Sequence, residues 1–86
     1  MESSGSPGDL VVRAAAGDEV AWRQLVDRFA SLVWSVARAH RLSSTDTADV
    51  SQTVWLRLVE HLGRLDDPDR VAGWLLVTTR RECLRV

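Results

Sequence analysis

The chain contains no lysine, no tyrosine and a single cysteine, and only two of its 86 residues are proline. Because Cys83 is alone, an internal disulfide and a cysteine cage for a metal ion are both excluded. We expect its side chain to be a reduced, small apolar group. No apolar run approaches the ~20 residues that span a bilayer, and the N-terminus lacks the charged-then-apolar pattern of a signal peptide. The sequence therefore predicts a cytoplasmic protein without a membrane partner.

Motifs for catalysis and cofactor binding are missing as well. His40 and His61 lie far apart, and neither belongs to a zinc or nucleophile motif. Asp66, Asp67 and Asp69 crowd one short segment, but they lack the spacing and the distant glutamate of a calcium loop. A glycine-rich phosphate cradle is absent too. We therefore expect no enzyme activity and no cofactor, and binding is the better supported kind of function.

The composition is that of one small folded domain. Hydrophobic residues make up 45% of the chain, too many for a disordered protein, and 86 residues allow only a thin core. The net charge of −1 argues against tight, nonspecific binding to duplex DNA. Positive charge is nevertheless concentrated near the end, where Arg80, Arg81 and Arg85 accompany Glu82.

The hydrophobic pattern predicts an all-α fold, a small bundle of three main helices plus a short N-terminal helix, because no stretch alternates with period two. Residues 1–8 are rich in Ser, Gly and Pro, and are predicted to form a disordered tail before a helical domain over 9–86. A short helix over 9–16 would be capped by Asp9 and ended by a left-handed Gly17.

A second helix is predicted from about residue 19 to about residue 40, with Asp18 as its cap. Trp34 departs from the buried side of this helix and shares a side with several arginines. It either packs against a neighbouring helix with its N–H at the edge, or stacks on a base or holds a partner. The buried side should comprise Trp22, Leu25, Val26, Phe29, Leu32, Val33, Val36 and Ala37.

The third helix, predicted over residues 46–62, organises the chain. Asp46 is the expected N-cap, which would place Asp49 in the first turn, where an acid complements the helix dipole. The apolar stripe of this helix consists of Val50, Val54 and Leu58, with Trp55 and Leu62 beside them.

The opposite side of the third helix is polar with one exception. Leu56 is either the apolar anchor of a reversible partner-binding surface or an ordinary exposed leucine. Gln52 has no structural explanation of the kind that Asp49 has, so it is the more suggestive residue. This side carries Asp49, Gln52, Thr53, Leu56 and Glu60.

A fourth helix is predicted from Pro68, capped by Asp67, to the end of the chain. Arg80 and Arg81 lie off its buried side, where they either complement the helix dipole or bind a ligand. The buried side should comprise Val71, Trp74, Leu75 and Thr78.

Three stretches stand in register along the chain: ADVSQTVWLRL at residues 48–58, AAGDEVAW at residues 15–22 and GWLLVTTRR at residues 73–81. Together they resemble the small extracytoplasmic-function group of bacterial sigma factors, the promoter-specificity subunits of RNA polymerase. Residues 48–58 (ADVSQTVWLRL) resemble the core helix of their region two. Residues 15–22 (AAGDEVAW) resemble the opening helix and its Gly-Asp turn, and residues 73–81 (GWLLVTTRR) resemble the Trp-Leu helix. The resemblance covers nearly all of residues 9–86 and implies a role in transcription initiation.

The resemblance implies a first surface that docks on the clamp helices of the largest subunits of core RNA polymerase. Carried over by position, it would use Asp49, Gln52, Thr53 and Leu56. Asp49 could pair with an arginine, Gln52 could form a hydrogen bond, and Leu56 would be the apolar anchor. Thr53 departs from the family, where Glu is usual, so one charge-assisted contact would be missing.

A second implied surface would open the promoter and hold the non-template strand of the minus-ten element, with one base flipped into a pocket. Arg81 lies where the family often has a base-reading Asn, so only hydrogen-bond donors are offered there. Arg80 and Arg81 could also bind phosphates. By position the candidates lie in the loop from Leu65 to Arg70, with Leu65, Asp66 and Arg70 nominated for DNA binding, and on the last helix at Val77, Arg80 and Arg81.

Two other functions remain as alternatives. The domain could keep the fold but bind only a regulator such as an anti-sigma factor, which would explain the departures at Thr53 and Arg81 as lost constraint. A small enzyme domain is disfavoured because no acid–base or nucleophile pair converges. Sigma factors of this group also carry a helix-turn-helix domain for the minus-35 element, to which no stretch of the 86 residues corresponds.

Overall fold

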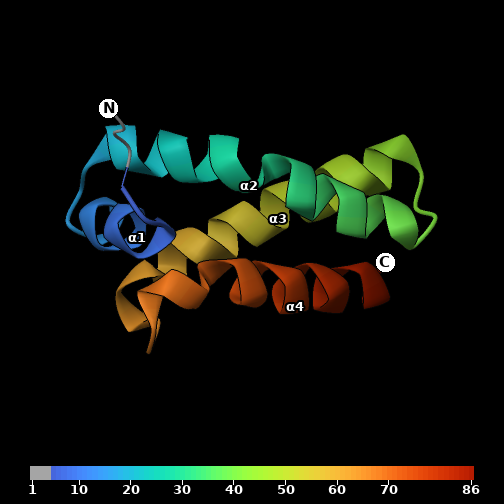
Figure 1. The fold of residues 1–86 in the computed structure, drawn as a ribbon. Coiled ribbons are helices and arrows are strands. Elements are labelled where there is room, and N and C mark those ends of the chain that lie inside the picture. The colour runs from blue at the N-terminus through green and yellow to red at the C-terminus, as the bar shows by residue number, and fades with distance from the viewer. Residues whose placement is uncertain (1–4) are drawn as a thin grey trace.

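The computed structural model describes residues 5–86, which are helical throughout apart from short turns and contain no strand. Figure 1 shows α2 and α4 on opposite sides of the molecule, α3 crossing between them, and α1 at one end near the connection to α4. The elements are α1 (Pro7–Ala15), α2 (Glu19–Ala39), α3 (Ser44–His61), two short 3-10 turns η1 (Leu62–Arg64) and η2 (Pro68–Arg70), and α4 (Val71–Leu84). The all-α prediction is confirmed. No helix within this range is both long and apolar enough to cross a bilayer.

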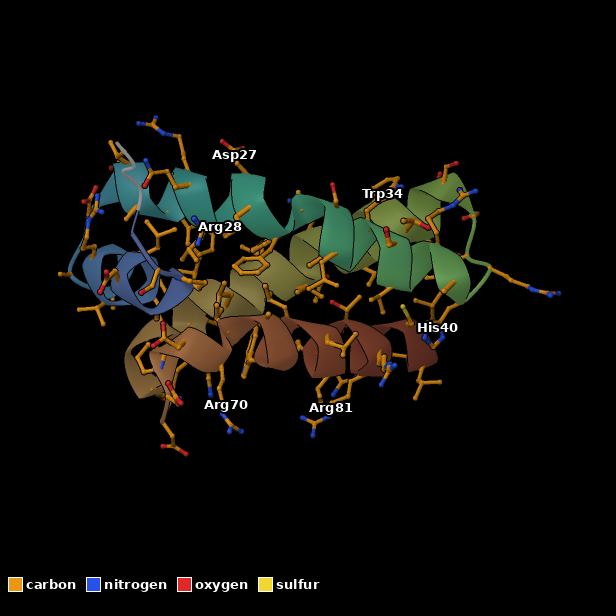
Figure 2. All side chains as sticks on the ribbon, viewed as in Figure 1. Asp27, Arg28, Trp34, His40, Arg70 and Arg81 are labelled. Atoms are coloured by element: carbon orange, nitrogen blue, oxygen red, sulfur yellow. The ribbon has the colours of Figure 1, made fainter. Side chains whose placement is uncertain are left out.

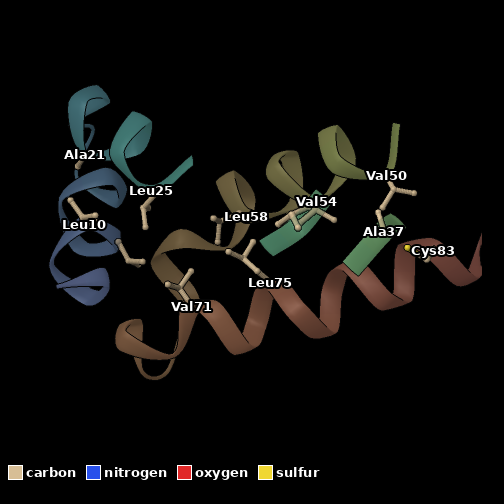
Figure 3. Packing of buried hydrophobic residues seen from close by; sticks show 12 residues of the cluster. Leu10, Ala21, Leu25, Ala37, Val50, Val54, Leu58, Val71, Leu75 and Cys83 are labelled. Carbon is tan, nitrogen blue, oxygen red and sulfur yellow. The ribbon is translucent and has the colours of Figure 1, made fainter. Parts of the chain in front are cut away.

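Leucine and valine side chains from all four helices form the core, as Figure 3 shows. The predicted stripe of α3 is confirmed, because Val50, Val54 and Leu58 are all buried. Leu25 of α2 and Leu75 of α4 are fully buried as well. Because one side of α3 is buried in this core, its opposite side can face solvent or a partner.

The first helix begins earlier than the sequence predicted. Ser6, not Asp9, is the N-cap of α1, and its hydroxyl oxygen accepts a hydrogen bond from the backbone N–H of Asp9 at 3.1 Å. Pro7 and Gly8 therefore belong to the helix and not to a disordered tail, and Gly8 is buried. The rest of the predicted tail includes residues 1–4, which lie outside the described residues.

The turn between α1 and α2 agrees with the sequence prediction. Gly17 has a φ of +102°, which few other residues adopt. The Asp18 carboxylate accepts hydrogen bonds from the backbone N–H groups of Val20 and Ala21 and pairs with Arg13 at 3.0 Å. These donors, led by the Ala21 N–H and the Arg13 side chain, lower the pKa of Asp18 below its ordinary value of 3.8.

The predicted cap of α3 was wrong. Ser43 caps this helix by accepting a hydrogen bond from the Asp46 N–H at 3.0 Å, so Asp46 is the acid of the first turn. Asp49 then lies beyond the first turn, where the helix dipole no longer accounts for an acid. The structural explanation that the sequence offered for Asp49 is thereby removed, which leaves its exposed carboxylate without an assigned structural task.

Two 3-10 turns, rather than a simple loop, connect α3 to α4. Asp67 is the cap that the sequence predicted, accepting a hydrogen bond from the Asp69 N–H at 3.1 Å, but the segment from Pro68 to Arg70 is a 3-10 turn. The α-helix itself begins at Val71. A hydrogen bond joins α1 to this connection: the Gly8 N–H donates to Asp69 Oδ1 of η2 at 2.8 Å.

Candidate functional site

The outer side of α3 is accessible, as the sequence predicted. Asp49 and Gln52 are exposed, Thr53 is half-buried, and Leu56 is 59% exposed. An exposed leucine flanked by polar side chains is a small apolar anchor that a partner helix can cover. The four predicted docking residues therefore lie on one helix with their accessible atoms available to a partner.

A shallow groove adjoins this side of α3, and we call it the tryptophan groove. Trp22 and Trp55 form one wall, where their rings meet edge to face with centroids 6.1 Å apart. Trp34 is 42% exposed and reaches the groove from α2, where Figure 2 shows it at the edge shared with α3. The lining residues are Trp22, Trp34, Ala48, Ser51, Gln52, Trp55, Leu56 and Val59.

A second hollow, which we call the loop pocket, lies on a different face, where the loop over residues 65–67, η2 and α4 meet. It has a volume of about 740 Å³. Five of the six residues that the sequence nominated for DNA binding line it, and Arg80 is the exception. Arg80 is exposed on α4 and does not line this pocket. The lining residues are Leu65, Asp66, Asp67, Arg70, Gly73, Trp74, Val77, Thr78 and Arg81.

Trp74 links the loop pocket to α3. It was predicted as a core residue, but it is only half-buried, and its ring is stacked on His61 with centroids 5.3 Å apart and 24° between the planes. The sequence analysis missed Gly73, Trp74 and Thr78 as lining residues. Trp74 and Thr78 were not nominated because both also fit the buried pattern of α4.

The electrostatics of the α4 face are set by one partly buried ion pair. Glu82 is only 8% exposed, and its carboxylate accepts a hydrogen bond from Arg57 Nε of α3 at 2.8 Å. This pair joins α3 to α4 and neutralises one of the arginines on that face. In Figure 2 the Arg70 side chain of η2 and the Arg81 side chain of α4 extend on the side of the molecule that faces away from α2. The loop pocket and the tryptophan groove therefore lie on separate faces of the bundle.

A helical bundle with an accessible helix side and a separate pocket lined by arginines defines a small interaction domain. Residues 25–86 match the family model described as sigma-70 region 2. The chain therefore belongs to the sigma-70 region 2 family, and its general role is in promoter recognition with RNA polymerase. No curated protein and no solved structure gives a significant match. The matched range contains all the predicted binding residues, whereas α1 lies before it.

Proposed function

We propose that this domain docks on the clamp helices of core RNA polymerase through the outer side of α3 and holds one flipped base of the minus-ten non-template strand in the loop pocket. The observation that carries the proposal is the gathering of Leu65, Asp66, Arg70, Val77 and Arg81 around a single hollow that also contains Trp74. The three sequence stretches that resemble the extracytoplasmic-function group favour that group, whose members act in the cytoplasm.

The chemistry of the loop pocket suits a base better than a phosphate. Two aspartates and two arginines line it, so its formal charge is balanced. Asp66 offers hydrogen-bond acceptors and Arg81 offers donors, which together can read a base edge. Stacking on an aromatic ring contributes about 1–3 kcal/mol per base, which offsets an unstacking cost of a few kcal/mol. Trp74 is the ring available for this stacking.

The docking proposal rests on the accessible side of α3. Asp49, freed from a helix-dipole role, is available to pair with a basic side chain, and Gln52 is available for hydrogen bonds. Thr53, where the family usually has Glu, provides no charge. Leu56 must therefore contribute a larger share of the affinity than in a relative with the full set of charges.

Binding to a clamp-helix fragment tests the docking proposal. Leu56→Ala should weaken binding at least about tenfold, equivalent to about 1.4 kcal/mol, and Gln52→Ala should weaken it less. Leu84→Ala is the matched control, because Leu84 is 79% exposed on α4, away from the docking side. Equal affinities of wild type, Gln52→Ala and Leu56→Ala would refute the docking assignment.

Base selectivity tests the pocket proposal. Labelled single-stranded minus-ten oligonucleotides that differ at one base should bind with different affinities, and Arg81→Asn should change their order, because an amide adds an acceptor. Arg23→Ala, on the exposed side of α2, should leave the order unchanged. Equal affinities for all bases at every position would refute a base-reading pocket.

A protein regulator is a second candidate partner for the docking side. The observation in its favour is the tryptophan groove, which extends the apolar surface beyond Leu56 to Trp34 and Val59. An anti-sigma factor that covered this groove would compete with the polymerase. Trp34→Ala would then weaken binding to the regulator more than binding to the clamp-helix fragment.

A further inference from the structure

The wall of the loop pocket that leads into α4 is packed into the core only at its two ends. Leu65 is half-buried against the core, and Val71, which follows η2, is fully buried. Between them, the backbone N–H groups of Asp69 and Arg70 both donate to Asp67, at 3.1 and 2.9 Å. These bonds join residues no more than three positions apart, so they fix the shape of the turn but not its place relative to the helices.

The first turn of α1 holds the middle of this wall. The N–H groups of a first turn have no partner within their own helix. Pro7 has no N–H, and the Asp9 N–H donates to the Ser6 cap of the same helix. The remaining donor, the Gly8 N–H, reaches Asp69 Oδ1 at 2.8 Å. The positive end of the α1 dipole favours a carboxylate at this place as well.

The fit between α1 and η2 is too close for a side chain at residue 8. A Cβ on Gly8 would overlap the Asp69 carboxylate and lie 3.1 Å from the Asp69 backbone nitrogen. Leu10 and Val11 of the same helix are buried in the core, which fixes α1 in turn. Figure 1 shows α1 at the end of the bundle where the connection to α4 passes. The position of η2 is therefore defined by a helix remote from it in the sequence.

We infer that α1 is a positioning element of the loop pocket, in which the Gly8–Asp69 hydrogen bond holds η2 where Asp67 and Arg70 can contact the flipped base. This inference rests on the proposed function for the identity of the ligand. It adds a role for residues 7–15, which precede the range matched to the family. Gly8 and Asp69 do not line the pocket, so both are positioning residues that act through its wall.

Base discrimination is the property that this role controls, because polar contacts that read a base tolerate displacements of only about 0.5 Å. Anisotropy of four labelled single-stranded minus-ten oligonucleotides, which differ at the flipped base, gives the ratio of the weakest to the tightest dissociation constant. Asp69→Ala and Gly8→Ala should each reduce this ratio about fivefold, the discrimination of one good pair of base contacts. Binding to the clamp-helix fragment should be unchanged, because α3 does not contribute to this contact.

Asp69→Asn separates the hydrogen bond from the charge. It removes the same negative charge as Asp69→Ala but keeps an oxygen that can accept from the Gly8 N–H. We expect it to retain the wild-type ratio while all four oligonucleotides bind somewhat more tightly, because a negative charge near the DNA is gone. Amide hydrogen exchange reports on the bond directly: the Gly8 N–H should exchange slowly in wild type and Asp69→Asn, and faster in Asp69→Ala.

Ser43→Ala is the control for a general loss of stability. It removes the hydroxyl that caps α3, which contacts neither Gly8 nor Asp69, and it should keep the wild-type ratio at a temperature where the variant is folded. A ratio lowered as much in Ser43→Ala as in Asp69→Ala would overturn the inference in favour of general destabilisation. An Asp69→Asn variant as impaired as Asp69→Ala would overturn it in favour of charge.

The remaining outcomes separate the inference from the proposed function. Wild-type ratios in both Asp69→Ala and Gly8→Ala would overturn the positioning role and leave the base pocket standing. A wild-type chain that bound all four oligonucleotides equally would overturn the base pocket and, with it, the positioning role.

Discussion

The contact between Gly8 and Asp69 predicts that a single methyl group at the N-terminal helix will disturb the loop pocket. A Cβ at Gly8 would lie 2.3 Å from Asp69 Oδ1 and 3.1 Å from the backbone nitrogen of Asp69. Rotating the Asp69 side chain would relieve only the first of these contacts. Gly8→Ala must therefore both break the 2.8 Å hydrogen bond and push η2 away from α1.

The magnitude follows from the bond that is lost. A hydrogen bond to a charged group contributes roughly 1.5–3 kcal/mol, and the partial exposure of this one reduces its share toward the lower end. Replacing glycine by alanine in a helix returns up to about 1 kcal/mol, so we expect a net loss of about 1 kcal/mol in the free energy of unfolding. For a domain of this size, that loss lowers the melting temperature by about 4–8 °C.

Circular dichroism melting curves and oligonucleotide binding together test this prediction. Gly63→Ala is the matched control, because a Cβ there meets no atom within 4 Å. Ser6→Ala is a second control, since it removes another cap of α1 without touching η2. Because η2 lines the loop pocket, Gly8→Ala should weaken oligonucleotide binding several-fold at a temperature where it is folded, while clamp-helix binding is unchanged. A Gly8→Ala variant as stable as wild type would refute the reasoning.

Three further predictions concern single side chains. Arg57→Ala should lower the free energy of unfolding, measured with denaturant, by roughly 1–3 kcal/mol, because it leaves the mostly buried Glu82 carboxylate without its partner. Adding Glu82→Gln to this variant should recover part of the loss. Additive losses from the two substitutions would contradict this coupling. Cys83 should react slowly with iodoacetamide at pH 7 in the folded state, because burial and the nearby Glu82 raise the pKa of its thiol; the labelling rate should rise with denaturant, and rapid labelling of the native protein would contradict the burial. The pKa of Asp18 is lowered, so its contribution is present above its ordinary value of 3.8 and is lost as the pH falls through the lower, folded value. Asp18→Asn should therefore reduce the loss of stability on acidification in this range, and an unchanged acid profile in thermal unfolding would disprove that role.

The helices could be predicted well, because each depends on local spacing. The four-residue spacing of Val50, Val54 and Leu58 predicts which side of α3 is buried, whatever the helix packs against. Helix starts were less predictable. The stretch from Ser43 to Asp46 offers several residues able to cap. In the structure Ser43 is the cap, and the buried Thr47 donates its hydroxyl to the Ser43 carbonyl at 2.8 Å.

The candidate surfaces were predictable only where their residues lie close together in the sequence. The docking residues of α3 share one helix side, so the spacing between Gln52 and Leu56 brings them together. The loop pocket was nominated from a family resemblance, and its aromatic wall was missed because Trp74 also fits the buried pattern of α4.

The sequence by itself determined the helical bundle, the accessible side of α3 and the family of the domain, because short-range periodicity and motif spacing encode all three. Only the tertiary structure decided which residues of different helices and turns contact one another. The Gly8 N–H reaches Asp69 across 61 positions, and Arg57 reaches Glu82 across 25. Such pairs form when packing brings remote segments together, and no local pattern records them. That packing also decides which arginines are balanced within the protein, because Arg57 is neutralised by a partner on another helix whereas Arg64 and Arg85 remain exposed.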